Sequence, residues 1–199
     1  MRNHLITIAL VGTMTLCSCS DWFDVSPKTD VKAAELFESE DGFMEALAGI
    51  YVSMTDDAAY GDNLSFGMLD QMAQLYDMIP DGATDRSEIY DYTNTTSGGY
   101  NTKGKLADSW GKAYNIIANA NNLLKWLDEK GVTVITNEQT RNMIRGEALA
   151  IRAYVHFDVL RGWGPIYSEN PSTKCMPYRT TADKEKMPLL PANEVAEKI

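Results

Sequence analysis

The residue with the most sharply defined chemistry is a cysteine that follows a short apolar stretch near the N-terminus. Residues 5–16 (LITIALVGTMTL) are apolar. They suit the core of a signal peptide and are too few to span a bilayer, which takes about 20 residues. Leu16 and Ser18 stand at positions −3 and −1 relative to Cys19, which is the arrangement of a lipobox. We therefore predict a lipoprotein signal peptide over residues 1–18, lipidation at Cys19 and attachment to a membrane by acyl chains. An ordinary secretory signal or a buried N-terminal strand is the alternative.

A second group of residues could bind a ligand. Residues 77–104 mix tyrosines with Asp, Asn, Thr and Gly and have no helical period. Such long aperiodic stretches are often functional. Aromatic rings stack on the apolar faces of sugars, while carboxylate, amide and guanidinium groups bond the sugar hydroxyls. The candidate ligand-binding residues are Tyr76, Asp77, Arg86, Tyr90, Tyr92, Asn94 and Tyr100. The alternative is that several of these tyrosines pack beneath the segment.

Other reactive residues do not predict catalysis or a metal site. Arg152 and His156 are four residues apart and share a helical face, but arginine is not a metal ligand. Glu147 and Asp158 lie on the same helix, and we expect all four side chains to form ion pairs and hydrogen bonds in a helix hairpin. The acidic residues between 77 and 91 lack the spacing of a calcium loop. No phosphate loop or nucleophile elbow is present, so we predict no metal and no cofactor.

The charge of the chain also restricts its partners. The 199 residues carry a formal net charge of −10, without a cluster of Lys and Arg. Nucleic-acid binding requires such a cluster, so this class of partner is excluded. The lack of such a cluster also argues against a polybasic attachment to anionic lipid, which leaves a covalent or an apolar anchor.

Helices must position these residues, and the apolar spacing predicts where they run. Residues 20–31 have no helical period and are expected to form an extended tether. Ser39 is an N-cap for a helix with an apolar face made of Phe43, Ala46, Leu47, Ile50, Tyr51 and Met54. A Met-rich helix is expected over residues 64–75. Residues 162–191 hold five of the seven prolines and are expected to be irregular, with a new helix from Ala192 or Asn193.

The strongest helical signal predicts an antiparallel hairpin between these segments. Apolar residues recur at three- and four-residue spacing from Leu106 to Leu127, with Gly131 as the C-cap. Asn137 or Thr136 caps a second helix that runs to about Leu160. Its expected apolar stripe is Ile144, Ala148, Ile151, Val155 and Val159, flanked by Met143, Tyr154 and Phe157. Two such helices with a short link pack against each other.

Several motifs, in order along the chain, resemble the RagB/SusD family of outer-membrane nutrient-uptake lipoproteins. The first is the lipobox with the acidic aromatic start of residues 19–29 (CSDWFDVSPKT), followed by Leu36-Phe37. Next come Phe43-x-x-Ala46-Leu47-x-Gly49-Ile50-Tyr51 and Trp110-x-x-x-Tyr114-x-x-Ile117-x-x-Ala120-Asn121-x-Leu123-Leu124. The most specific is residues 146–161 (GEALAIRAYVHFDVLR), leading to Gly164-Pro165.

The resemblance implies an all-α, SusD-like fold built of tetratricopeptide-like helix hairpins with long irregular loops. It divides the chain into a signal peptide (1–18), a tether and extended start (19–38) and an N-terminal helical domain (39–199). Because family members are usually more than twice as long, we expect the chain to be truncated at its C-terminus.

The resemblance also implies a function without catalysis. The protein would be lipid-anchored in the outer membrane of a Gram-negative bacterium and exposed on the cell surface. There it would capture oligosaccharides, polysaccharides or other nutrients for import through a TonB-dependent, SusC-like transporter. The alternative is a helical-repeat scaffold lipoprotein that only holds a partner protein.

Overall fold

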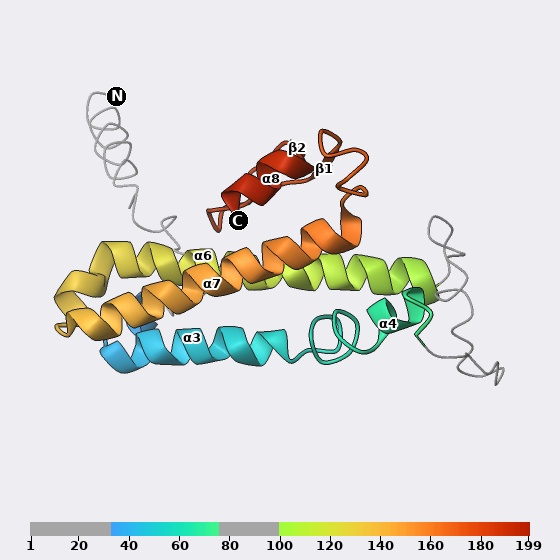
Figure 1. Cartoon of the computed structure of the whole chain (residues 1–199). Helices are drawn as coiled ribbons and strands as arrows, with labels where there is room; N and C mark the ends of the chain where they lie inside the picture. Colours follow the sequence, from blue (N-terminus) through green and yellow to red (C-terminus); the bar gives the residue numbers. More distant parts are fainter. Residues whose placement is uncertain (1–32, 76–99) are drawn as a thin grey trace, which may run out of the picture. The chain divides into compact units, whose positions relative to one another are not determined.

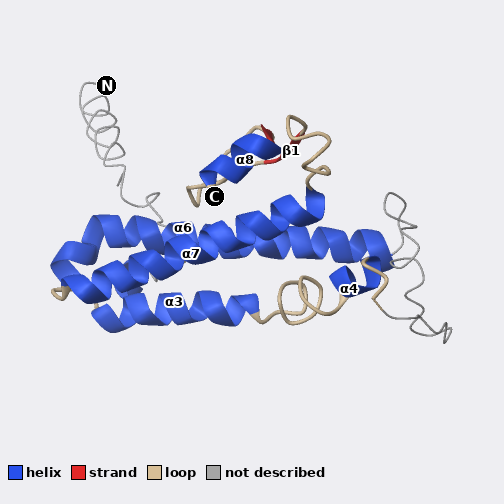
Figure 2. Ribbon diagram, in the orientation of Figure 1, coloured by secondary structure: helices blue, strands red, loops and turns tan. Residues whose placement is uncertain are grey.

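The computed structural model describes residues 33–75 and 100–199. The chain divides into two compact units, Met1–Glu35 and Leu36–Ile199, and every element below lies in the second. Nearly all regular structure in the described residues is helical (Figure 2). The predicted all-α class is therefore confirmed. No helix in the described residues is long and apolar enough to cross a membrane.

The first helix of this unit begins where its cap was predicted. In α3 (Glu40–Met54), the Ser39 hydroxyl accepts a hydrogen bond from the backbone N–H of Gly42 at 3.1 Å. Glu40 and Asp41 stand in the first turn, where negative charge favours the helix dipole. The predicted face is confirmed at its centre, where three side chains are buried: Phe43, Leu47 and Ile50. Tyr51 lies at the edge of this face and is 44% exposed.

The predicted helix over residues 64–75 is wrong in extent. Only α4 (Met68–Met72) is helical there, and the chain before it runs in turns. The Ser65 hydroxyl donates to the carbonyls of Tyr60 and Asp62, and the Asp62 carbonyl also accepts from the Gly67 N–H at 2.9 Å. Such local bonds compete with helical ones for the same backbone groups. A Cβ at Gly67 would also lie 1.8 Å from Asp62 Oδ1, so this turn requires glycine.

The predicted hairpin is confirmed, and it forms the centre of the fold. The helices α6 (Lys105–Val134) and α7 (Glu138–Trp163) run antiparallel and side by side, and α3 packs along them (Figure 1). The Asn137 side chain caps α7 by accepting from the N–H groups of Gln139 and Thr140. All five predicted stripe residues of α7 are buried: Ile144, Ala148, Ile151, Val155 and Val159. The predicted flanking residues are about half exposed: Met143, Tyr154 and Phe157.

The predicted end of the first hairpin helix is wrong. Gly131 lies inside α6, and the backbone N–H of Ile135 closes the last turn by bonding the Gly131 carbonyl at 2.9 Å. Ile135 is fully buried, and its packing in the core favours continuation of the helix beyond Gly131. Gly131 serves packing instead, because a Cβ there would lie 2.9 Å from the Leu127 side chain. A π-helix, η3 (Tyr100–Gly104), leads into α6 within the segment that was predicted to be irregular.

The C-terminal segment is irregular as predicted, with a short sheet that the periodicity did not indicate. Strand β1 (Lys174–Met176) pairs antiparallel with β2 (Leu190–Pro191), and Lys174 lies opposite Pro191. Met176 is fully buried and joins the helical core. Helix α8 (Ala192–Lys198) then begins at a predicted residue, and the Ala192 N–H bonds the Thr173 carbonyl at 3.1 Å.

Candidate functional site

Most of the residues that the sequence singled out lie outside the described parts of the chain. This holds for the lipidation residue and for six ligand-binding candidates: Cys19, Tyr76, Asp77, Arg86, Tyr90, Tyr92 and Asn94. Tyr100 is the first residue of η3, and its side chain is not described. Both assignments therefore remain predictions, and the structure points instead to a polar cavity beside the helix hairpin.

One wall of this cavity is a loop that a buried histidine holds against α7. His156 is completely buried, and its Nε2 accepts the backbone N–H of Arg179 at 3.1 Å. Nδ1 lies 2.8 Å from the Arg152 carbonyl, so Nδ1 must carry the ring hydrogen. The Tyr178 ring lies on the imidazole with 4.3 Å between ring centroids. Burial lowers the pKa of His156 from 6.5 to about 4. The contact between His156 and the loop therefore requires a neutral imidazole.

Two residues of α6 hold the same loop from the other side of the hairpin seam. The Tyr114 hydroxyl donates to the Pro177 carbonyl at 2.7 Å. The Asn121 amide, on a residue 2% exposed, donates to the carbonyls of Arg179 and Thr181, each at 3.2 Å. Polar groups at such buried positions require partners. These side chains find them in the loop backbone, which fixes the path of the loop across the hairpin.

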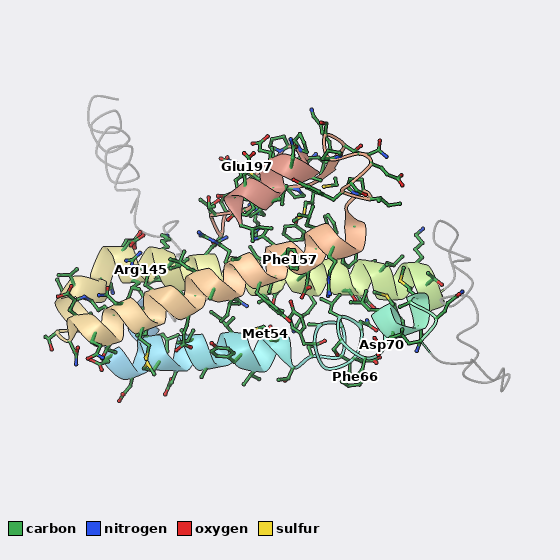
Figure 3. The ribbon with its side chains drawn as sticks, in the orientation of Figure 1. Met54, Phe66, Asp70, Arg145, Phe157 and Glu197 are labelled. Carbon is green, nitrogen blue, oxygen red and sulfur yellow. The ribbon has the colours of Figure 1, made fainter. Side chains whose placement is uncertain are left out.

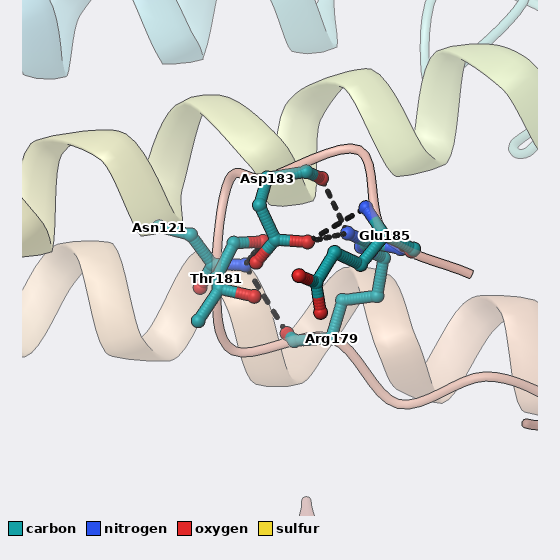
Figure 4. A network of polar contacts seen from close by, with 5 residues as sticks. All are labelled: Asn121, Arg179, Thr181, Asp183 and Glu185. Atoms are coloured by element: carbon teal, nitrogen blue, oxygen red, sulfur yellow. Dashed lines mark hydrogen bonds and ion pairs between the residues drawn. The ribbon is translucent and has the colours of Figure 1, made fainter. Parts of the chain in front are cut away.

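The loop also closes on itself around one arginine. The Arg179 guanidinium donates to the backbone carbonyls of Asp183 and Glu185 and to the Asp183 carboxylate (Figure 4). The Asp183 carboxylate also accepts from the Glu185 N–H at 2.9 Å. Hydrogen bonds from the Thr181 side chain and the Glu185 N–H lower the pKa of Asp183. Residues 179–185 therefore form a closed turn with its own internal bonds.

A cavity of about 530 Å³ lies between this loop and the hairpin. Helix α6 lines it with a mixed set of side chains: Asn121, Leu124, Lys125, Asp128 and Glu129. Helix α7 contributes Arg145, Leu149 and Arg152, and the loop contributes Thr180, Thr181 and Ala182. The volume falls within the range of small-molecule sites, and the lining offers both donors and acceptors. The cavity can therefore accept a ligand with several polar groups.

Most charges around the cavity are already paired. Arg145 forms an ion pair with Asp128, and Lys125 lies 3.9 Å from Glu129 in the next turn of α6. The Arg152 guanidinium instead donates to the neutral Asn121 amide oxygen at 3.0 Å. Asn121 thus links Arg152 to the loop backbone, and one amide connects both helices with the cavity wall.

Sequence reasoning missed this cavity, although the sequence contains one residue that indicates it. Asn121 occupies a position on the apolar stripe of α6, where the surrounding residues are buried. A polar side chain on a buried face indicates a specific partner. The identity of that partner was not available from spacing, because the bonded carbonyls lie 58 and 60 residues away.

A second, apolar hollow of about 400 Å³ lies between α7 and α8. Its lining includes Phe157, Leu160 and Pro165 from α7 and the turn after it, and Ala196 from α8 (Figure 3 labels Phe157). Tyr167, also on the rim, is 53% exposed and Phe157 is 50% exposed. Two accessible aromatic rings therefore lie on the same side of α7 as the C-terminal segment.

Comparison with known proteins identifies the family. A SusD-like family model, described as starch-binding and associating with the outer membrane, matches residues 21–189. The SusD-like protein P25 of Formosa agariphila is 23% identical over 183 residues, which cover 85% of this chain and 32% of that protein.

Two solved structures share the fold. A SusD superfamily protein from Bacteroides thetaiotaomicron superposes with a TM-score of 0.62 and 20% identity, covering 80% of this chain and 35% of the other. One from Bacteroides fragilis gives 0.63 and 22%, covering 82% and 38%. The chain thus spans about a third of the length of these relatives. The family model matches most of the chain, and the fold is helical as in these structures. This chain therefore belongs to the SusD-like family of starch-binding proteins that associate with the outer membrane.

Proposed function

We propose that this chain is part of a non-catalytic surface lipoprotein that captures glycans for import through a TonB-dependent, SusC-like transporter of the outer membrane. The observation that carries the proposal is the family match over residues 21–189. The helical fold that the chain shares with two SusD superfamily structures supports it.

The lipobox supports the proposed location. Acylation at Cys19 would hold the protein on the membrane, and the apolar residues 5–16 would direct its export. A single acyl chain binds a membrane only weakly, so several chains would be needed for a stable anchor. The tether of residues 20–31 would then separate the helical unit from the lipid.

Glycan capture in this proposal uses two groups of residues. The first is the segment of residues 77–104 together with Tyr76, whose rings and polar side chains suit stacking and hydroxyl recognition. The second is the polar cavity beside α6 and α7, which offers Thr180, Lys125 and Arg152 as donors. Recognition by such groups needs no reacting residue, in agreement with a binding role.

Affinity electrophoresis of the full chain through gels containing starch or other polysaccharides tests the proposal. We expect a polysaccharide to retard the protein, and the variant Tyr90→Ala/Tyr92→Ala to be retarded less. Loss of two stacking contacts of about 1 kcal/mol each corresponds to roughly tenfold weaker binding or more. The variant should keep its melting temperature within a degree or two. A much lower melting temperature would show that the tyrosines are structural, and unchanged retardation would place the site elsewhere.

Co-purification from outer membranes separates capture from scaffolding. A transporter that co-purifies with the chain, together with polysaccharide retention, is the expected result. Co-purification without retention of any polysaccharide in the gels would favour the scaffold alternative.

A further inference from the structure

Among the described residues that line the cavity beside the hairpin, one cation has no carboxylate to balance it. Lys125, Arg145 and Arg152 line it with three positive charges, and Asp128 and Glu129 with two negative ones. Asp128 pairs with Arg145, and Glu129 with Lys125. None of the ion pairs between described residues includes Arg152. This local excess of positive charge occurs in a chain whose formal net charge is −10.

Most N–H donors of the Arg152 guanidinium meet no acceptor among the described residues. It offers five N–H groups, and one of them, at Nη1, meets an acceptor among the described residues, Asn121 Oδ1 at 3.0 Å. Asn121 is itself fixed by two bonds to the loop, so this contact orients the guanidinium plane. A guanidinium held in this way presents a planar fork that matches a carboxylate in a bidentate manner.

The rest of the cavity suits a sugar better than a bare anion. Its volume of about 530 Å³ exceeds what a small anion would fill, and Thr180 and Ala182 form an open rim of the loop. Leu149, 39% exposed, lies one turn before Arg152 on α7 and offers an apolar surface within the same lining. An apolar side chain, hydroxyl groups and a guanidinium without an ion pair among the described residues together match a ring with hydroxyls and a carboxylate.

We propose that this cavity is a binding site for an acidic saccharide, whose uronate carboxylate pairs with Arg152. The proposal rests on the proposed glycan capture and adds a ligand class to it. Binding occurs without any covalent step. Arg145, already paired with Asp128, stands at the opposite end of the α7 lining and limits the site on that side.

The sharpest test neutralises Arg152 without removing it. Leu149 is three residues from Arg152 and four from Arg145, so all three share one helical face. In Leu149→Glu, an internal carboxylate would occupy the place of the uronate, while Leu149→Gln adds the same length without charge. Leu149 is partly exposed and makes no polar contact of its own, so neither change should unfold the protein. Circular dichroism melts of both variants verify this.

Calorimetric titrations of the full chain in detergent with digalacturonate and with neutral galactobiose provide the measurement. We expect the parent chain to bind digalacturonate about tenfold more tightly or better, since charge-assisted bonds are the stronger ones. Both variants lose the apolar contact of Leu149 and should bind each disaccharide more weakly, but Leu149→Glu should also remove the preference for digalacturonate and Leu149→Gln should retain it. Added salt should weaken digalacturonate binding in the parent.

Three results would overturn the proposal. One is equal affinity for the two disaccharides, or no binding of digalacturonate. Another is a preference that Leu149→Glu leaves unchanged. The third is competition by sodium acetate as strong as that by digalacturonate, which would indicate a site for bare carboxylate. Polysaccharide retention in the affinity gels would survive each of these results, so failure here is distinguishable from failure of the proposed function.

Discussion

The buried histidine predicts a specific acid sensitivity of this fold. His156 accepts a hydrogen bond from the Arg179 N–H and directs its own ring hydrogen to the Arg152 carbonyl. Protonation of Nε2 would place a hydrogen against that backbone N–H and break the contact. The charged or titratable groups that face the ring come from both helices and the loop: Arg152, Tyr114, Tyr178 and Arg179. None of them is a carboxylate that would favour the imidazolium.

The magnitude follows from the pKa values of the two states. The folded pKa of about 4 lies below the ordinary 6.5, so the unfolded chain binds a proton that the folded chain does not. Stability therefore falls with decreasing pH. The contribution of His156 is complete above pH 6.5 and is lost as the pH falls from 6.5 toward 4. The difference between the two pKa values of His156 corresponds to roughly 3 kcal/mol in the free energy of unfolding. About 2 kcal/mol of this is lost by pH 5. Typical domains have only about 5–15 kcal/mol of stability.

The assay is urea unfolding at pH 7 and pH 5 for the parent and for His156→Gln. Glutamine can form hydrogen bonds at this position but does not titrate in this pH range. Carboxylates also begin to protonate near pH 5, and they do so equally in both proteins. The parent should therefore lose about 2 kcal/mol more than the variant between the two pH values. The variant itself should be less stable at pH 7, because glutamine cannot reproduce both bonds and the ring contact with Tyr178.

An equal loss of stability in the two proteins would refute this reasoning. It would mean that His156 titrates alike in the folded and unfolded states, and hence that the imidazole is open to water. Imidazole resonances followed by NMR should show the same behaviour directly, with His156 mostly neutral in the folded protein at pH 5.

Two further predictions concern the core and the anchor. Ile151→Ala should lower the free energy of unfolding by roughly 2–4 kcal/mol, because Ile151 is 5% exposed in the hairpin seam. A thermal melt that this change leaves in place would contradict the assigned buried face. Cys19→Ala should abolish metabolic labelling by a fatty acid and Cys17→Ala should preserve it. Label that persists in the Cys19 variant would disprove the lipidation site.

Helices α3 and α7 could be predicted because their determinants are local. Ser39 and Asn137 cap their own helices through N–H groups two or three residues away. The stripe from Ile144 to Val159 repeats at helical spacing, and burial of one face follows from that period. Part of the resemblance to the family lies in the same segments, whose motifs include buried residues such as Phe43 and Val155.

One failed boundary depended on a tertiary contact, and the other on local hydrogen bonds that the apolar spacing does not contain. Glycine is common at the ends of helices, yet the burial of Ile135 continues the helix past Gly131. Residues before α4 have helical spacing of apolar side chains, yet Ser65 and Asp62 take up the backbone groups in turns. At Gly131 the burial of Ile135 was stronger than the helix propensity, and before α4 local bonds to the backbone were stronger.

The cavity depended entirely on the tertiary structure. Its loop wall is irregular in sequence, and its anchors lie 23 residues away at His156 and 58 at Asn121. Neither separation leaves a trace in periodicity, because the loop contributes a backbone N–H to His156 and backbone carbonyls to Asn121, groups that nearly every residue type has. From the sequence, Arg152 was one polar residue of a helix. Only packing of α6, α7 and the loop determined that its guanidinium faces a cavity with no carboxylate to balance it among the described residues.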